Sequence, residues 1–200
     1  MCPPIFYFKE YTMKVTNNFS YYEFGPSGCK VTWVPDNEYQ KRLIKDLAQN
    51  LQVLRDIAKV PIKIMSGVRS MDDYYRLQGS GYNPSETSDH FCGVAVPIKP
   101  TSTKYKKFGS TYNFAVGAGD CIPNGMSVRT FFELAMKAYV DSKVKFGQII
   151  YEKDPVKKVE WVHVSNLYEH YFSSSTVAWL GKTKFMQSVD GGKNYTIASL

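Results

Sequence analysis

A stripe of apolar residues in the first half of the chain constrains its fold more than any other feature. Five apolar side chains recur at spacings of three and four, the period of one α-helical face: Ile44, Leu47, Leu51, Leu54 and Ala58. Pro35 precedes the stripe, Asp36 can cap a helix there, and Glu38 suits a first helical turn. The pattern predicts one long amphipathic helix that begins after Pro35 and packs against a second layer.

Short runs elsewhere have the composition of β-strands. The runs FGQIIYE (146–152) and EWVHVS (160–165), separated by a turn, predict two antiparallel strands. Further strands are expected over three runs: 60–65, 91–98 and 113–123.

The remaining segments complete the expected fold. Ser127 can cap a second helix that runs to about Tyr139, and residues 66–88 are expected to form a polar loop with one short helical turn. The tail predicts a hairpin around residues 190–192. The sequence therefore predicts an α+β fold, with a small antiparallel sheet and flanking helices, in a single domain over residues 1–200.

Composition narrows the function classes. The 200 residues carry a net charge of +7 and are 44% hydrophobic, which fits a folded domain rather than a disordered chain. The charge suits an anionic partner, but the basic residues are scattered, so most are expected to be solvated surface and a nucleic-acid partner is not expected. No run approaches a membrane span, and the N-terminus lacks the pattern of a signal peptide, so we expect a soluble protein made in a cytoplasm.

The four cysteines have no CxxC spacing: Cys2, Cys29, Cys92 and Cys121. Reduced, buried thiols are the expected state, because a disulfide framework is typical of short secreted chains. Cys92 and Cys121 lie close in sequence to His90 and Asp120, so a disulfide between them or a thiolate ligand is the alternative.

Two of the three histidines stand in strand-like runs. Strand alternation puts Trp161, His163 and Ser165 on one face of their run and two valines on the other, which we expect to face the core. A single histidine of this kind is most often structural. A second histidine, His90, stands at the start of another run, which favours a site that both histidines share.

The segments around these histidines resemble a known family. SDHFCG-x-A (88–95) and EWVHVS are similar to the two metal-binding segments of the D-Ala-D-Ala carboxypeptidase-like zinc peptidases, a group that resembles the hedgehog and lysostaphin zinc folds and has a bacteriophage endolysin branch. The likeness extends over most of the chain, from NFSYYEF (18–24) through the long helix and the Ser-Gly-x-Arg-Ser loop to GQIIYE. It implies a hedgehog/D-Ala-D-Ala peptidase-like fold, bound Zn²⁺ and hydrolysis of a peptide bond in bacterial peptidoglycan.

The chain departs from the family pattern S-x-H-x-x-G-x-A-x-D at its last position, where Pro97 replaces the aspartate ligand. One interpretation is an inactive relative that has lost a ligand. The alternative follows from Gly117-Ala118-Gly-Asp120, which resembles the second half of the same motif. An insertion at about 97–116 would then split the motif, and the resemblance would make His90, Asp120 and His163 the zinc ligands.

The resemblance also implies a catalytic apparatus. Glu160 matches a Glu-x-x-His pattern with His163 and is expected to be the general base. Regular strand alternation would put it on the opposite face from His163, so Glu152 is the second candidate. Arg69 is expected to contact the substrate or to stabilise the developing oxyanion.

Three further residues are considered for the site. Ser88 and Gln148 are expected to bind substrate, and His170 would be a ligand only if Asp120 failed to reach the site.

These assignments lead to two hypotheses of function. The first is a zinc metallopeptidase, either an endopeptidase or a D,D-carboxypeptidase, that acts on peptidoglycan peptides in phage lysis or as part of a virion. Its location would be the host cytoplasm before lysis or the virion, with other virion proteins as further partners and no membrane association. The alternative is a non-catalytic phage structural or cell-wall-binding protein on the same scaffold.

Overall fold

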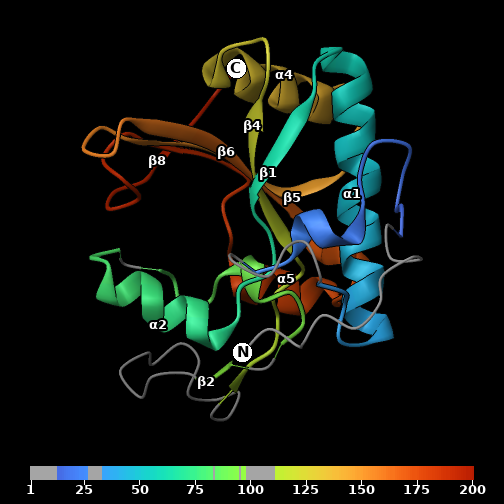
Figure 1. The fold of residues 1–200 in the computed structure, drawn as a ribbon, viewed down its shortest axis with the longest axis vertical. Helices are drawn as coiled ribbons and strands as arrows, with labels where there is room; N and C mark the ends of the chain where they lie inside the picture. Colours follow the sequence, from blue (N-terminus) through green and yellow to red (C-terminus); the bar gives the residue numbers. More distant parts are fainter. Residues whose placement is uncertain (1–12, 27–32, 83, 95, 98–110) are drawn as a thin grey trace.

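The computed structural model describes residues 13–26, 33–82, 84–94, 96–97 and 111–200 (Figure 1). Cys2, Cys29 and most of the expected insertion lie outside the described residues. Two short strands lie at the start of the expected insertion and within it: β2 (Val96–Pro97) and β3 (Thr111–Tyr112). They pair antiparallel with each other and not with the main sheet. The residues just before position 98 and just after position 110 are therefore neighbours in space.

The main sheet has six strands in the order β1-β4-β6-β5-β7-β8. Their bounds are Ile62–Ser66 (β1), Ala118–Pro123 (β4), Phe146–Asp154 (β5), Val159–Asn166 (β6), Phe185–Ser188 (β7) and Thr196–Ile197 (β8). The expected pair β5–β6 is confirmed as antiparallel, and so is the C-terminal hairpin of β7 and β8.

The sheet is mixed, so the expectation of an antiparallel sheet was wrong at one position. β7 pairs parallel with β5. The cause is the connection after β6, which folds as the 3-10 helix η4 (Tyr168–His170) and helix α5 (Ser174–Leu180). This connection carries the chain past β5, so that β7 joins the far side of β5 and runs in the same direction.

Helices α1 (Glu38–Ala58) and α4 (Val128–Val140) pack on one face of the sheet (Figure 1). The apolar stripe of α1 is buried as predicted, except that Ala58 at the helix end is only partly buried. The cap is Asn37 rather than Asp36, since the Asn37 side chain accepts from the amide of Gln40. Ser127 caps α4 as predicted. None of the helices in the described ranges is both long and apolar enough to cross a membrane.

The segment between β1 and β4 differs most from expectation. Residues 66–88 contain a nine-residue helix, α2 (Met71–Gly79), capped by Ser70. The strand expected at 91–98 is largely absent from the described part of that run, because Asp89–Phe91 form the 3-10 helix η3 and Cys92 has a left-handed φ of 47°. Local hydrogen bonds of a capped turn therefore outweigh the strand propensity of the apolar run.

Gly67, directly after β1, allows a close approach between two segments. A Cβ at this position would lie 2.2 Å from the carbonyl oxygen of Phe24, at the end of the 3-10 helix η1 (Tyr21–Phe24). The amide of Val68 donates to that same oxygen at 2.6 Å. The N-terminal segment and the loop after β1 are thus held together where only glycine fits.

Gly67→Ala is expected to lower the free energy of unfolding by about 1–3 kcal/mol, because the new methyl collides with backbone that cannot move independently. Gly79→Ala is the matched control, since a Cβ there meets nothing within 4 Å. The control should be neutral or stabilising by up to about 1 kcal/mol. Urea unfolding of the three proteins measures both effects, and equal midpoints would contradict the close approach.

Candidate metal centre

His90 is held in one orientation by the loop after β1. Its Nδ1 lies 2.6 Å from the carbonyl oxygen of Gly67, and its own carbonyl accepts from the amide of Arg69 at 2.7 Å. A carbonyl oxygen only accepts, so Nδ1 carries the proton and Nε2 presents a lone pair. The ring is almost fully buried, at 3% exposure. This arrangement is the one by which proteins orient a metal-binding imidazole.

Asp120 and His163 are brought together by strand register. They are direct partners across β4 and β6, so both side chains project from the sheet face that α1 and α4 leave free. Val162 and Val164 on the opposite face are fully buried, which confirms the predicted alternation of β6.

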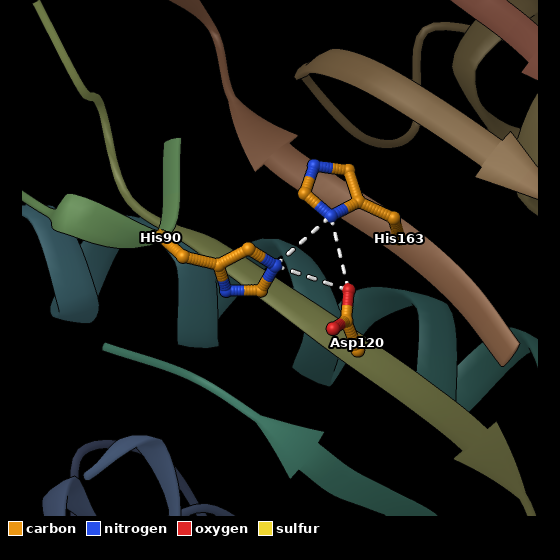
Figure 2. Close-up of side chains that lie close together, drawn as sticks. All are labelled: His90, Asp120 and His163. Carbon is orange, nitrogen blue, oxygen red and sulfur yellow. Dashed lines mark hydrogen bonds and ion pairs between the residues drawn. The ribbon is translucent and has the colours of Figure 1, made fainter. Parts of the chain in front are cut away.

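Three ligand atoms converge at this point, as Figure 2 shows. His90 Nε2 lies 3.1 Å from Asp120 Oδ1 and 3.1 Å from His163 Nδ1, and the third side, His163 Nδ1 to Asp120 Oδ1, is 3.0 Å. Pro97 stands where the family pattern has an aspartate, and the structure brings another carboxylate to the two histidines, that of Asp120, 30 positions after His90. Among the histidine, cysteine, aspartate and glutamate side chains of the described residues, these three form a group that could hold a metal ion.

The cluster fits a small divalent cation. Ligand bonds of about 2.0–2.2 Å in tetrahedral geometry place ligand atoms about 3.3–3.6 Å apart, a few tenths of an ångström more than the separations seen here. Two imidazole nitrogens and one carboxylate oxygen suit zinc and neighbouring transition metals, and three protein ligands leave a position for water or substrate. A cation between the three atoms also satisfies the lone pair of His90 Nε2, which has no proton of its own.

The charges of the three groups are mutually adjusted. Burial alone would raise the pKa of Asp120, but the two neighbouring imidazoles outweigh it and hold that pKa well below its usual range. Burial lowers the pKa of His90. Burial also opposes protonation of His163, yet the hydrogen bond to Asp120 raises its pKa overall. The cluster therefore keeps an ionised carboxylate at neutral pH, as a metal ligand requires.

Glu152 shares the sheet face with the cluster. It lies on β5 opposite Trp161, two residues along the strands from the pair Ile150–His163 and so on the same face. Burial, reinforced by the charge of Asp120, raises the pKa of Glu152 to about 7. One carboxylate oxygen accepts from the hydroxyl of Tyr195 at 3.1 Å.

Glu160, the first-choice base, lies on the other face of β6. Its carboxylate accepts from the hydroxyl of Tyr151, and it does not line the cavity that contains the cluster. The reason is that β6 alternates regularly from Glu160 to His163, without a bulge to turn the acid around. Glu152, the second candidate, therefore lies on the face of the cluster and lines its cavity, whereas Glu160 does neither.

A cavity of about 650 Å³ surrounds the cluster. Arg69, Ser88 and Gln148 all line it, so the structure brings these expected site residues together. Arg69 Nη1 donates to Ser88 Oγ at 3.2 Å, and Gln148 Nε2 donates to the carbonyl of Thr183 at 3.0 Å. His170 is exposed in η4 and takes no part in the cluster.

The cysteines near the site are not ligands of this cluster. Cys92 and Cys121 are buried and form no disulfide with each other, so the alternative of a disulfide between them was wrong. Burial raises the pKa of the Cys92 thiol far above its usual range, which disfavours the thiolate.

Two features of the site were missed in the sequence. Asp89 is buried beside His90 and is paired with Lys182 at 2.9 Å, while the Tyr168 hydroxyl donates to its other oxygen. Tyr195 reaches Glu152 from the C-terminal hairpin. Only the position of Asp89 next to a candidate ligand could have drawn attention to it, because its partners are distant in the chain.

Comparison with protein-family models, with curated proteins and with solved structures finds no match for this chain.

Asp120→Asn is expected to weaken zinc binding by more than about 100-fold, because even outer-sphere partners of a metal are worth about 10–100-fold. His170→Ala is the matched control and should bind zinc like the wild type. A zinc-chelator competition titration measures the affinities. A wild-type protein with no bound zinc, or an Asp120→Asn variant with unchanged affinity, would contradict the site.

The raised pKa of Glu152 predicts a pH dependence of stability in the metal-free protein. The folded state keeps a proton on this group up to pH about 7, whereas the unfolded chain loses it near 4.5. The group therefore favours folding at low pH, and its contribution is lost as the pH rises through this window. Glu152→Gln should show a smaller fall in the free energy of unfolding between pH 5 and 8 than the exposed control Glu169→Gln, in urea titrations with EDTA. An equal fall in the free energy of unfolding for the two variants would contradict the raised pKa of Glu152.

Proposed function

We propose that the chain is a zinc-dependent peptidase that hydrolyses a peptide bond in bacterial peptidoglycan. The single observation that carries this proposal is the convergence of His90 Nε2, Asp120 Oδ1 and His163 Nδ1 within 3.1 Å of one another, in a cavity that also contains Glu152. The proposal takes its substrate class from the resemblance of the two histidine segments to the D-Ala-D-Ala carboxypeptidase-like peptidases. The α+β fold with the cluster on one sheet face is consistent with a hedgehog-type scaffold.

A zinc ion at these ligands would polarise the scissile carbonyl and lower the pKa of water to about 7. Glu152 is the general base in this proposal. Its carboxylate takes a proton as water adds to the carbonyl carbon, and it delivers a proton to the amine as the carbon–nitrogen bond breaks. A carboxylate with a pKa near 7 suits both roles at neutral pH.

Arg69 supplies a fixed positive charge to the same cavity. Its guanidinium is oriented by the bond to Ser88 Oγ, and a planar cation of this kind stabilises a developing oxyanion or binds a substrate carboxylate. Gln148 is held by the carbonyl of Thr183 on one side and by the hydroxyl of Tyr168, at 3.3 Å, on the other. Ser88 and Gln148 therefore serve as fixed polar groups of the substrate site.

The biological setting is part of the proposal. A net charge of +7 suits association with an anionic cell wall, and the phage-type resemblance suggests a lysis or virion-associated enzyme. Such a protein would reside in the host cytoplasm before lysis or in the virion, with peptidoglycan peptides and other virion proteins as partners. The alternative of a non-catalytic cell-wall-binding or structural protein rested on Pro97, and the carboxylate of Asp120 in the cluster weakens that support.

The test is hydrolysis of purified peptidoglycan by the zinc-loaded protein, followed by labelling of new amino groups and mass spectrometry of the fragments. Glu152→Gln should reduce the rate by about 10²–10⁴-fold, the usual contribution of a general base. Glu160→Gln is the matched control and should keep activity close to that of the wild type. No new amino groups with wild type would overturn the proposed function, and an inactive Glu160→Gln with an active Glu152→Gln would reverse the assignment of the base.

A further inference from the structure

The turn between β7 and β8 lies against the sheet face that carries Glu152 and the metal cluster. β7 runs beside β5 with Ser188 opposite Glu152, so the chain enters the turn next to that acid. The amide of Gly191 donates to the carbonyl of Lys153 at 2.9 Å, which fastens the turn to β5. Gly191, Gly192 and Tyr195 all line the cavity.

The turn is rigid by its own hydrogen bonds. Asp190 Oδ1 accepts from the hydroxyl of Ser188 at 2.8 Å and from the amides of Lys193 and Asn194 at 3.1 and 3.0 Å. The amide of Gly192 donates to Ser188 Oγ at 3.1 Å. Tyr195 therefore starts from a fixed backbone rather than from a free tail.

Gly192 allows the turn to approach the acid. Its φ is +79°, and a Cβ there would lie 3.3 Å from Glu152 Oε2 and 3.0 Å from the hydroxyl of Tyr195. A side chain would separate the two groups or be pushed away by them. The glycine thus sits beside a hydrogen bond between residues 43 positions apart.

The hydrogen bond itself selects one oxygen of Glu152. Tyr195 donates to Oε2 at 3.1 Å, and no other hydrogen bond to this carboxylate occurs among the residues that the structure describes. Oε1 is therefore the oxygen left for water or substrate in the cavity.

We propose that Tyr195 is a positioning residue for Glu152, and that the C-terminal hairpin is a part of the active site rather than an appended strand pair. The inference rests on the proposed function of Glu152 as base. By holding Oε2, the phenol fixes the rotamer of the acid, directs Oε1 to the reacting water and favours the ionised form that accepts a proton.

The experiment compares zinc-loaded wild type with Tyr195→Phe, which removes one oxygen atom and keeps the ring. Tyr75→Phe is the matched control, because Tyr75 lies on α2 outside the cavity and is 58% exposed. With a soluble muropeptide as substrate, Tyr195→Phe should lower kcat by about tenfold, the effect of one hydrogen bond to a charged group, with KM changed by less than about twofold. The acidic limb of its kcat–pH profile should move to higher pH. An unchanged kcat and profile would overturn the proposal, as would a loss confined to KM.

A second readout does not depend on turnover. In protein labelled with ¹³C at the glutamate carboxyls, Glu152→Gln identifies the Glu152 signal, and its pH titration gives the pKa directly. Tyr195→Phe should raise that pKa by about one pH unit, because the carboxylate loses a hydrogen-bond donor, whereas Tyr75→Phe should leave the pKa unchanged. If wild type fails to cleave the muropeptide, the peptidase proposal fails, and this titration still decides the role of Tyr195: an equal pKa in wild type and Tyr195→Phe would refute it.

Discussion

The antiparallel register of β4 and β6 is the constraint on which the site depends. It places Asp120 directly opposite His163, and the alternation of both strands turns their side chains away from the helices. A slip of one residue would point the valines of β6 into the cavity and bury the ligands in the core. The fully buried Val162 and Val164 therefore specify the metal site as well as the core, because they fix which face of the strand is polar.

The third ligand comes from a different kind of structure. His90 stands in a single turn of 3-10 helix, and its ring is aimed by one carbonyl, that of Gly67. Gly67 in turn packs against Phe24, so the orientation of the ring depends on the N-terminal segment as well as on β1. The buried pair of Asp89 and Lys182 anchors the same turn from the C-terminal side. The site is thus assembled from both ends of the chain, which couples its geometry to complete folding.

Sequence patterns were sufficient to predict an element where the contacts that determine it are periodic or local. The stripe of α1, the cap of α4 and the alternation of β6 all follow from spacings within one element. They were insufficient where a distant partner decides the outcome. The 3-10 turn at His90 replaced an expected strand, the regular course of β6 removed Glu160 from the cavity, and the contact between Tyr195 and Glu152 joins residues that no local pattern relates. The convergence of Asp120 with the two histidines was predicted from a split motif, and the pairing of β2 with β3 brings the residues on either side of 98–110 together.

X-ray absorption at the zinc edge tests the central claim most directly, because it reports the atoms around the metal without reference to activity. Zinc-loaded protein should show a first shell of nitrogen and oxygen at about 2.0–2.1 Å with the outer-shell signature of two imidazole rings, contributed by His90 and His163. A sulfur shell at about 2.3 Å, or an oxygen-only shell without imidazole scattering, would mean that zinc does not bind where the three ligand atoms converge.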